Sequence, residues 1–513
     1  MEQISLLKKG VMTVALAVAG TVVPMAALWA GPAVNHTHRR VKARLDVDFK
    51  LIGTLAQRTT AEIGKTGFMI GCETLDRGYT DFEAYKEYLP QLGIRKIRLQ
   101  AGWARCEKEK GRFDFAWLDK IVDWSVANGL DPYLCCVFGN PLYADEKSKG
   151  LFSRIPAEGE GHEAWRRWIH ELAGHYAGRV RHFETWNEPN NVKGNTPEII
   201  AANNIETAEI IRSHIPDAHV TGIVLGHRAE MHSIMEAIAS HGKAGLFNAY
   251  SVHLYDANPE SSVVWVDQTL NDMATLAPGV KLIDGESGAP GEMIPKFGFS
   301  GWPFTEISQA KLDMRRMLVD HSRGVDSSVF AISDMHYDGV EGTFKNAKGL
   351  LRANERREII QVKKAFYAVQ NVVNVFDGTR EIVPAEKSTF RNLDTTVWFD
   401  EYRSTSGDLP PLVVFWQWQT RELKNAPDSL KRERICNCPI PSDSCTTRTF
   451  TFDRKGAPFR EPVWVDLLTG GVYEFPDENQ IVHSTGVTYV NVPVYDSPAI
   501  LADRCSLPVL PLK

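Results

Sequence analysis

Two segments of the sequence each end an apolar, strand-like run with a glutamate. In RHFETWNEPN (181–190), Glu188 stands between an amide and a proline, and in KLIDGESGAP (281–290) the run ends at Glu286. Two carboxyl groups in one site can share acid and nucleophile chemistry, because one can donate a proton while the other stays ionised. The pair can act in this way only if the fold brings the two strand ends together.

From about residue 60 the sequence alternates short β-rich runs with amphipathic helical stretches. In the stretch 115–130, for example, apolar residues recur at helical spacing and Gly129 is a typical helix end. Eight strands that alternate with helices predict an α/β fold, a (β/α)8 TIM barrel. An open doubly wound sheet would show a Gly-rich turn after its first strand, and GCETLDRG (71–78) is not one. The predicted strands are 66–72, 94–100, 131–138, 181–186, 218–226, 248–255, 280–286 and 327–333.

In this barrel Glu188 closes the fourth strand and Glu286 closes the seventh. Active sites of TIM barrels lie at the carboxyl ends of the strands, so both side chains are expected on one rim. Two facing carboxyl groups suit cleavage of a glycosidic bond, in which one protonates the leaving oxygen and the other attacks the sugar. We expect them about 5 to 5.5 Å apart, the separation typical of retention of configuration.

The residues around this pair resemble those of clan A glycoside hydrolases, and most closely those of glycoside hydrolase family 39. WNEPN after an apolar strand and a later strand that ends in Gly-Glu carry the resemblance. The segment 102–134 is similar to the second βα unit of that family, and 349–372 resembles its last barrel helix. In all, the resemblance covers roughly residues 60–372, taken as the catalytic barrel.

The resemblance implies a retaining O-glycosyl hydrolase. We expect no cofactor, because the two carboxyl groups can carry the proton and the covalent bond themselves. The resemblance also implies that Glu188 is the general acid/base, that Glu286 is the nucleophile, and that Asn187 binds the sugar 2-hydroxyl. The sequence departs from the family pattern at IDGES (283–287), where a Thr-Glu pair is expected, and at SDM (333–335), which lacks the Trp of many clan members. These departures leave the sugar, the linkage, and exo or endo action open.

Other acidic residues compete with this pair. Glu73 lies in a polar loop, whereas Glu184 is in mid-strand and is expected to be a paired charge that faces the barrel interior or a helix. Asp284 alternates with Glu286 on one strand and is the leading rival for the nucleophile. A plainer interpretation of NEPN is a turn in which Glu188 is a solvated first-turn acid.

Three further residues are candidates for substrate binding or for support of the nucleophile. Arg98, late in the second strand, is either a surface salt-bridge partner or the cation that keeps Glu286 ionised. His253 and Tyr255 follow the sixth strand and alternate toward one face. The resemblance implies that they hydrogen-bond the nucleophile and the substrate, and the alternative for His253 is a satisfied core histidine.

A zinc site assembled from His253, His227 and His336 is the competing metal hypothesis. The sequence contains no HExxH motif and no close pair of ligands to support it. We therefore expect no metal.

Aromatic side chains in the loops after the strands are candidate platforms for a sugar ring. We assign Trp103 and Trp302 to substrate binding, and roughly half of the whole set is expected to pack beneath long loops instead. The Gly- and Pro-rich loop 288–309 follows the nucleophile strand and is expected to set specificity. The other candidates are Tyr143, Trp186, Trp265 and Tyr337.

After residue 373 the sequence changes to short alternating runs separated by turn residues, which predicts an antiparallel β-sandwich over 373–513. The segment 44–53 is expected to lend it a strand. Four cysteines lie in this region, and CNCPIPSDSC (436–445) favours one local disulfide, with connectivity left open. The four are Cys436, Cys438, Cys445 and Cys505, whereas Cys72, Cys135 and Cys136 lie in barrel strands and are expected to be buried thiols.

The N-terminal 33 residues differ from the rest in composition. Lys8 and Lys9 precede an apolar stretch (11–29) and then small residues, the order typical of a secretory signal, although an uncleaved membrane anchor is the alternative. We expect an exported protein, periplasmic or extracellular, with any membrane association through this segment only. The formal charge of −6 over 513 residues, without a long Lys/Arg run, gives no basis for nucleic-acid binding.

Two other functions stay open beside a retaining glycoside hydrolase acting on a carbohydrate. One is a clan A specificity outside family 39, such as that of an endo-glucanase. The other is a catalytically inactive carbohydrate-binding barrel, although such a scaffold would need neither glutamate.

If the leader is cleaved, the mature protein should begin near residues 31–34, because the small residues that signal peptidase requires lie there. N-terminal sequencing of exported protein measures this directly. Exported material that still begins at Met1 would favour the anchor.

Overall fold

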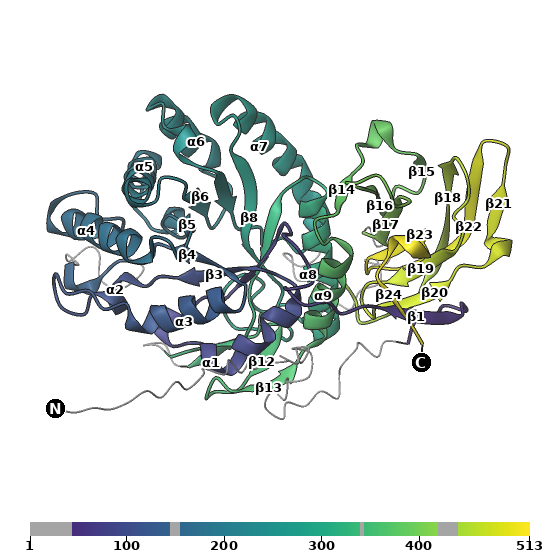
Figure 1. The fold of residues 1–513 in the computed structure, drawn as a ribbon, viewed down its shortest axis with the longest axis horizontal. Helices are drawn as coiled ribbons and strands as arrows, with labels where there is room; N and C mark the ends of the chain where they lie inside the picture. The colour runs from purple at the N-terminus through teal and green to yellow at the C-terminus, as the bar shows by residue number, and fades with distance from the viewer. Residues whose placement is uncertain (1–43, 144–153, 339–342, 419–439, 513) are drawn as a thin grey trace, which may run out of the picture. The chain divides into compact units, whose positions relative to one another are not determined.

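The computed structural model describes residues 44–143, 154–338, 343–418 and 440–512 (Figure 1). The leader 1–33 and the cysteines Cys436 and Cys438 lie outside the described residues, so export and the local disulfide stay predictions. Among the described residues, every helix is too short or too polar to cross a bilayer.

Eight parallel strands close into a barrel with helices around it, which confirms the predicted fold class (Figure 1). Each strand pairs with the next along the chain, and β9 closes the ring by pairing with β2, where Met69 lies opposite Ser328. The strands are buried on both faces, as expected of a parallel sheet covered by helices. They are β2 (Phe68–Gly71), β3 (Lys96–Gln100), β4 (Asp131–Cys135), β5 (His182–Glu184), β6 (His219–Leu225), β7 (Ala249–Val252), β8 (Lys281–Ser287) and β9 (Asp326–Val329).

The connecting helices start and end at residues with clear local roles. Thr196 caps the helix that follows β5, because its hydroxyl accepts from the Ile199 N–H and Pro197 takes the first helical position. Gly129, just beyond the third helix, has a φ of 74°, the left-handed backbone predicted for a helix end. The helices are α1 (Phe82–Tyr85), α2 (Trp103–Cys106), α3 (Ala116–Ala127), α4 (Gly159–Tyr176), α5 (Pro197–His214), α6 (Met231–Ser240), α7 (Val263–Leu276), α8 (Glu306–His321) and α9 (Lys364–Val375).

The segment after the eighth barrel strand is less helical than its resemblance to a last barrel helix suggests. α9 begins only at Lys364, and 351–362 forms a hairpin instead. The Asn354 side chain accepts from the backbone N–H groups of Arg356 and Glu358, which fixes the turn. Two hairpins therefore stand between β9 and α9, made of β10 (Met335–Tyr337) with β11 (Phe344–Asn346) and β12 (Leu351–Ala353) with β13 (Ile359–Val362).

The C-terminal region forms two antiparallel sheets, as its alternating pattern predicts. The larger sheet has the order β14-β16-β17-β23-β19-β20-β1-β24 and the smaller β15-β18-β22-β21. The segment 44–53 leads into β1 (Leu51–Leu55), which pairs with β20 and β24. The remaining strands are β14 (Arg380–Ile382), β15 (Phe390–Asn392), β16 (Val397–Ser404), β17 (Leu412–Gln417), β18 (Arg448–Lys455), β19 (Pro462–Asp466), β20 (Gly471–Glu474), β21 (Gln480–Val482), β22 (Gly486–Val494), β23 (Ala499–Asp503) and β24 (Val509–Pro511).

Aromatic residues dominate the core between these sheets, where Phe415, Phe450 and Trp464 are among the buried residues. Within the described residues Cys445 and Cys505 are free thiols, as are the buried Cys72, Cys135 and Cys136 of the barrel.

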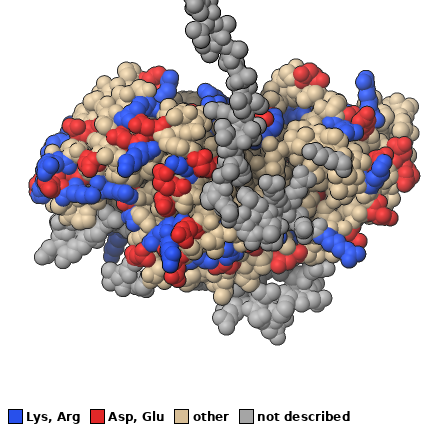
Figure 2. Space-filling model, turned by 60° about the horizontal axis from the view of Figure 1, so that its bottom comes forward, with Lys and Arg blue, Asp and Glu red and all other residues tan. Residues whose placement is uncertain are grey.

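On the face drawn in Figure 2, acidic and basic residues lie interspersed among the coloured part of the chain. This distribution agrees with the small net charge of −6.

Candidate active site

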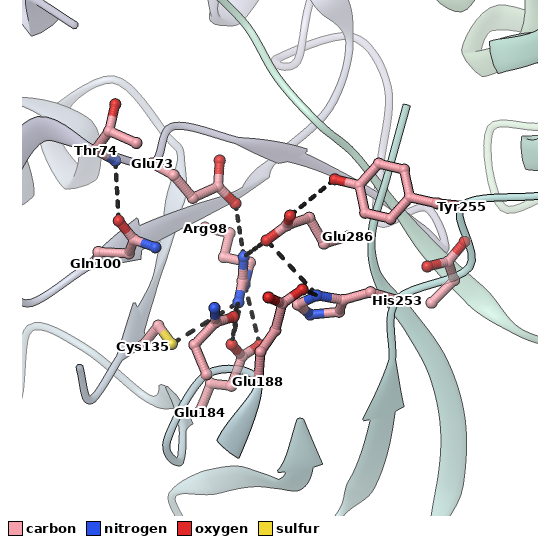
Figure 3. A network of polar contacts seen from close by, with 12 residues as sticks. Glu73, Thr74, Arg98, Gln100, Cys135, Glu184, Glu188, His253, Tyr255 and Glu286 are labelled. Carbon is pink, nitrogen blue, oxygen red and sulfur yellow. Dashed lines mark hydrogen bonds and ion pairs between the residues drawn. The ribbon is translucent and has the colours of Figure 1, made fainter. Parts of the chain in front are cut away.

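Arg98, on β3, lies at the centre of a buried polar network at one end of the barrel (Figure 3). Its Nη1 donates to Glu286 Oε2 and to Glu73 Oε1, both at 2.8 Å. Its Nε donates to Glu184 at 3.0 Å, and its Nη2 donates to Asn187 Oδ1 at 2.6 Å and also to Glu184. The surface salt-bridge alternative for Arg98 is therefore wrong, because the guanidinium is fully buried and binds Glu286 directly.

Glu286 extends from the end of β8 and keeps 11% of its side chain exposed. Its Oε2 accepts from Arg98, and its Oε1 accepts from the Tyr255 hydroxyl at 2.8 Å. Burial works to raise the pKa of Glu286, but the charges of His253 and Arg98 and the Tyr255 hydrogen bond hold that pKa below its ordinary value. The carboxylate is therefore ionised at neutral pH.

Glu188 follows β5 with a left-handed backbone, φ 48° and ψ 45°, which is rare for a residue with a side chain. Its N–H donates to the Val224 carbonyl, and Pro189 fixes the next residue. The carboxylate accepts from Asn191 Nδ2 at 2.8 Å and pairs with His253 Nδ1 at 2.7 Å. With 28% of its side chain exposed, Glu188 is more open to solvent than Glu286.

Gly226 has no side chain, and this leaves room for the carboxyl group of Glu188. A Cβ at Gly226, just beyond β6, would lie 2.9 Å from Glu188 Cδ and 2.4 Å from Asn191 Nδ2. Any side chain at this position would displace the carboxyl group.

His253 joins the two glutamates. It is buried, and one of its ring nitrogens lies within 4.8 Å of a carboxylate oxygen from each of Glu188 and Glu286, which are themselves within that distance of each other. Burial works to lower the pKa of His253, yet Glu286 and Glu188 more than offset this effect and raise it. His253 and Tyr255 thus both contact the glutamate pair, His253 on Glu188 and Tyr255 on Glu286.

Glu73 lies in the turn after β2, as predicted, but it is not a solvated loop residue. Its side chain is buried against Arg98, and burial followed by the nearby charge of Glu286 raises its pKa to about 7, although Arg98 opposes this rise. A signal was present, since Glu73 follows β2 just as Glu188 follows β5. Glu184 is the paired interior charge that was predicted.

Asp284 does not share the site with Glu286, so its role as a rival nucleophile is wrong. The pairing register of β8 with β9 shifts between Asp284 and Ser287, which breaks the alternation that would have aimed both carboxyl groups the same way. Asp284 instead accepts from the Leu254 N–H at 3.2 Å and lies 3.7 Å from Arg316 of α8.

Trp103 was predicted to be a sugar platform, and this is wrong. The loop after β3 folds into α2, which places the Trp103 ring in the interior with 1% exposure, stacked on Tyr143 and Trp168. Its Nε1 donates to Glu107. Trp302 is partly exposed and packs edge-on against Phe299, so its substrate role stays a prediction.

The histidines of the hypothetical zinc site are not brought together. His336 Nε2 lies 3.1 Å from the Ala353 carbonyl, and His227 is beside Glu230. Among the described residues, the group with metal-ligand spacing consists of Glu188, His253 and Glu286.

Comparison with known proteins identifies solved structures with a similar fold. No family model and no curated protein matches the sequence. Solved structures do match, among them a family 39 glycoside hydrolase from Bacteroides cellulosilyticus WH2, with 12% identity and a TM-score of 0.60 over 88% of this chain and 83% of that one. The GH39 enzyme from Xanthomonas axonopodis pv. citri has 15% identity and a TM-score of 0.55 over 86% and 95%.

A GH30 xylanase C from Talaromyces cellulolyticus has 10% identity and a TM-score of 0.53 over 88% of this chain and 98% of that one. The chain has the fold of the family 39 and family 30 glycoside hydrolases. The resemblance inferred from WNEPN and the Gly-Glu strand end is therefore confirmed at the level of fold.

Glu73→Gln should change how stability depends on pH. The pKa of Glu73 is raised in the folded protein to about 7, so between about pH 4.5 and 7 the folded state holds a proton that the unfolded chain has released. The wild type must lose stability relative to the variant as pH rises through this interval, because a glutamine does not titrate. Melting temperatures by scanning calorimetry measure the difference.

Glu83→Gln is the matched control, since Glu83 is 68% exposed and pairs only with Lys86 among the described residues. It should keep the pH slope of the wild type. A melting difference between wild type and Glu73→Gln that is constant from about pH 4.5 to 7 would contradict the buried proton.

Proposed function

We propose that the chain is a retaining glycoside hydrolase that cleaves O-glycosidic bonds of an oligo- or polysaccharide by double displacement. The observation that carries this proposal is the short distance between Glu188 and Glu286. One carboxylate oxygen of Glu188 lies within 4.8 Å of one carboxylate oxygen of Glu286. Retaining enzymes hold their carboxyl groups about 5 to 5.5 Å apart, whereas inverting enzymes need about 6.5 to 9.5 Å to admit a water.

In the first step Glu286 attacks the anomeric carbon while Glu188 donates its proton to the glycosidic oxygen. The bond from carbon to the leaving oxygen breaks, a covalent glycosyl ester forms on Glu286, and the leaving alcohol departs with the proton. Glu286 suits attack because cationic neighbours keep it ionised. Glu188 suits proton transfer because it is the more exposed carboxyl group and is oriented by His253 and Asn191.

In the second step Glu188 takes a proton from water, whose oxygen attacks the anomeric carbon and releases Glu286. Formation of the ester removes the negative charge of Glu286, which favours an ionised Glu188 that can act as the base. Two displacements on opposite faces leave the product with the configuration of the substrate.

In this proposal Asn187 binds a sugar hydroxyl in both steps. Its Oδ1 accepts from Arg98 Nη2 at 2.6 Å, which orients the amide so that its NH₂ group is the free donor. We assign this donor to the 2-hydroxyl, next to the carbon that Glu286 attacks.

The sugar is a separate question from the reaction. The similar structures include a β-xylosidase from Caulobacter crescentus CB15 and a glucosidase from Croceicoccus marinus, so neutral β-xylosides and β-glucosides are the first compounds to assay. A catalytically inactive carbohydrate-binding barrel is the alternative function. Hydrolysis and binding measured on one glycan panel separate the two, since binding without turnover of any bound glycan would overturn the enzymatic proposal.

The two glutamates should give different mutant phenotypes. Glu286→Ala should abolish turnover of every glycoside, because no other ionised carboxylate replaces the nucleophile. Glu188→Ala should lower the rate on alkyl glycosides by about 10²- to 10⁴-fold but spare formation of the ester from 4-nitrophenyl or dinitrophenyl glycosides, whose leaving groups need no proton. Added azide should restore turnover of Glu188→Ala and yield a glycosyl azide.

Glu206→Gln on α5 is a control that removes a carboxylate paired with His162 and Arg166 instead of one in the site. It should keep activity on all of these substrates. Equal losses on alkyl and aryl glycosides in Glu188→Ala would argue against a general acid.

The stereochemistry of the product should be retained. Proton NMR of the first-formed sugar, recorded before mutarotation, should show the anomer of the substrate, because the carboxyl groups are too close for a water between acid and base. An inverted first product would show that water attacks directly and that the pair is not used as described.

A further inference from the structure

Lys348 is a buried cation beside the nucleophile that the mechanism above does not use. It lies in the connection between β11 and β12 and is 1% exposed. Its Nζ lies 4.1 Å from the centre of the Tyr255 ring, the residue whose hydroxyl donates to Glu286. The rings of Phe330 and Phe299 stand at 5.8 and 5.9 Å from the same nitrogen.

The ammonium group of Lys348 has no hydrogen-bond or ion-pair partner among the described residues, unlike the other buried lysines. Lys311 donates to two carbonyls and to Asp496, and Lys363 donates to Asp334 and to a carbonyl. A lysine carries three donors, and burying them unpaired is costly. The contacts of Lys348 Nζ described above are instead with the aromatic rings of Tyr255, Phe330 and Phe299.

In the loop 288–309, the residue beside Lys348 Nζ is Gly298, which has no side chain. A Cβ at Gly298 would stand 3.4 Å from Lys348 Nζ and 3.3 Å from the Tyr255 ring. Gly298 therefore brings no polar side chain to the ammonium group.

The electrostatic surroundings make Lys348 a poorly stabilised cation. Burial lowers its pKa to about 8, although the charges of Glu286, Glu188 and Asp313 oppose this effect. Glu286 already receives hydrogen bonds from Arg98 and Tyr255, so it does not need Lys348 as a contact. An anion placed against Nζ would offset the cost of burying the charge.

We propose that Lys348 binds an anionic substituent of the sugar held at the nucleophile, so that the substrate is an acidic glycan that carries a carboxylate or a sulfate ester. This inference rests on the proposed function, because the sugar reaches Lys348 only if it occupies the site of Glu188 and Glu286. Lys348 is then a specificity-determining residue, and the neutral xyloside and glucoside are poor substrates.

Three 4-nitrophenyl β-D-glycosides that differ only at C6 test the proposal: the glucoside, the glucuronide and the glucoside 6-sulfate. The wild type should prefer at least one anionic compound, and Lys348→Met should lower kcat/KM for that compound about 10- to 100-fold more than for the neutral glucoside, the worth of a charge-assisted hydrogen bond. Lys348→Arg should keep most of the preference. Whichever anion is preferred identifies carboxylate or sulfate.

The pH dependence separates recognition from a structural role. The preference for the anionic compound should fall as pH rises through about 8, because Lys348 then loses its charge, whereas a packing role would leave the ratio of the two kcat/KM values unchanged. Lys345→Met is the matched control, since Lys345 lies three residues away and pairs with Glu292. It should leave the ratio at the wild-type value.

Failure of the proposal differs from failure of the proposed function. Hydrolysis of neutral glycosides with equal losses in Lys348→Met on neutral and acidic compounds would overturn the anion site and leave the hydrolase intact. If no glycoside is cleaved, calorimetric titration with D-glucuronate, D-galacturonate and D-glucose 6-sulfate decides. Binding of one of them that Lys348→Met abolishes supports the site, and equal or absent binding overturns it.

Discussion

The guanidinium of Arg98 is the group on which the geometry of this site depends. It is buried without exposure and binds Glu73 after β2, Glu184 on β5, Asn187 after β5 and Glu286 on β8. Bringing such charges into a protein interior costs several kcal/mol for each ion, and the cost is offset only when every partner is present and well oriented. One side chain therefore holds the ends of four strands in a fixed relation.

Arg98 fixes the position of Glu286, whereas the position of Glu188 is fixed by its own backbone and by other neighbours. Glu188 reaches its position through a left-handed backbone at the end of β5, a conformation that costs of order 1 to 3 kcal/mol for a residue with a side chain. The N–H bond to Val224, the constraint of Pro189 and the gap at Gly226 keep it there. Local strain is thus maintained by neighbours from two strands, as expected where a carboxyl group must face a second one.

Much of the architecture follows from the sequence pattern, and the failures have local causes. Periodicity and turn residues place all eight barrel strands, and the strand-end position singles out Glu188 and Glu286. Asp284 misleads because a register shift in β8 breaks strict alternation, and Trp103 misleads because α2 turns its ring into the interior. Neither a bulge nor a side-chain direction has a signature in the residue types themselves.

The partners of Arg98 show a second limit of sequence reasoning. Glu73 stands at a strand end like the two site glutamates, yet nothing in its neighbourhood reveals that a cation from the next strand will bury it. Lys348 is harder still, because it lies between two hairpins, and the second of them (351–362) replaces the start of the expected helix 349–372. Long-range charge pairing depends on which strand ends meet, and this is known only once the barrel has closed.

The two glutamates differ in their surroundings in a way that supports the roles proposed for them. Glu286 is the more buried and faces Arg98, Tyr255 and Lys348, which favour its negative charge. Glu188 pairs with His253 and accepts from Asn191, and it meets solvent with more than a quarter of its side chain. His253 lies between them with its pKa raised by both, so it links the charge on one carboxylate to the other. In the proposed mechanism, ester formation removes the charge of Glu286, so Glu188 is then the carboxylate that still interacts with the charge of His253. The proposed order of the two displacements therefore rests on this asymmetry between the two carboxyl groups.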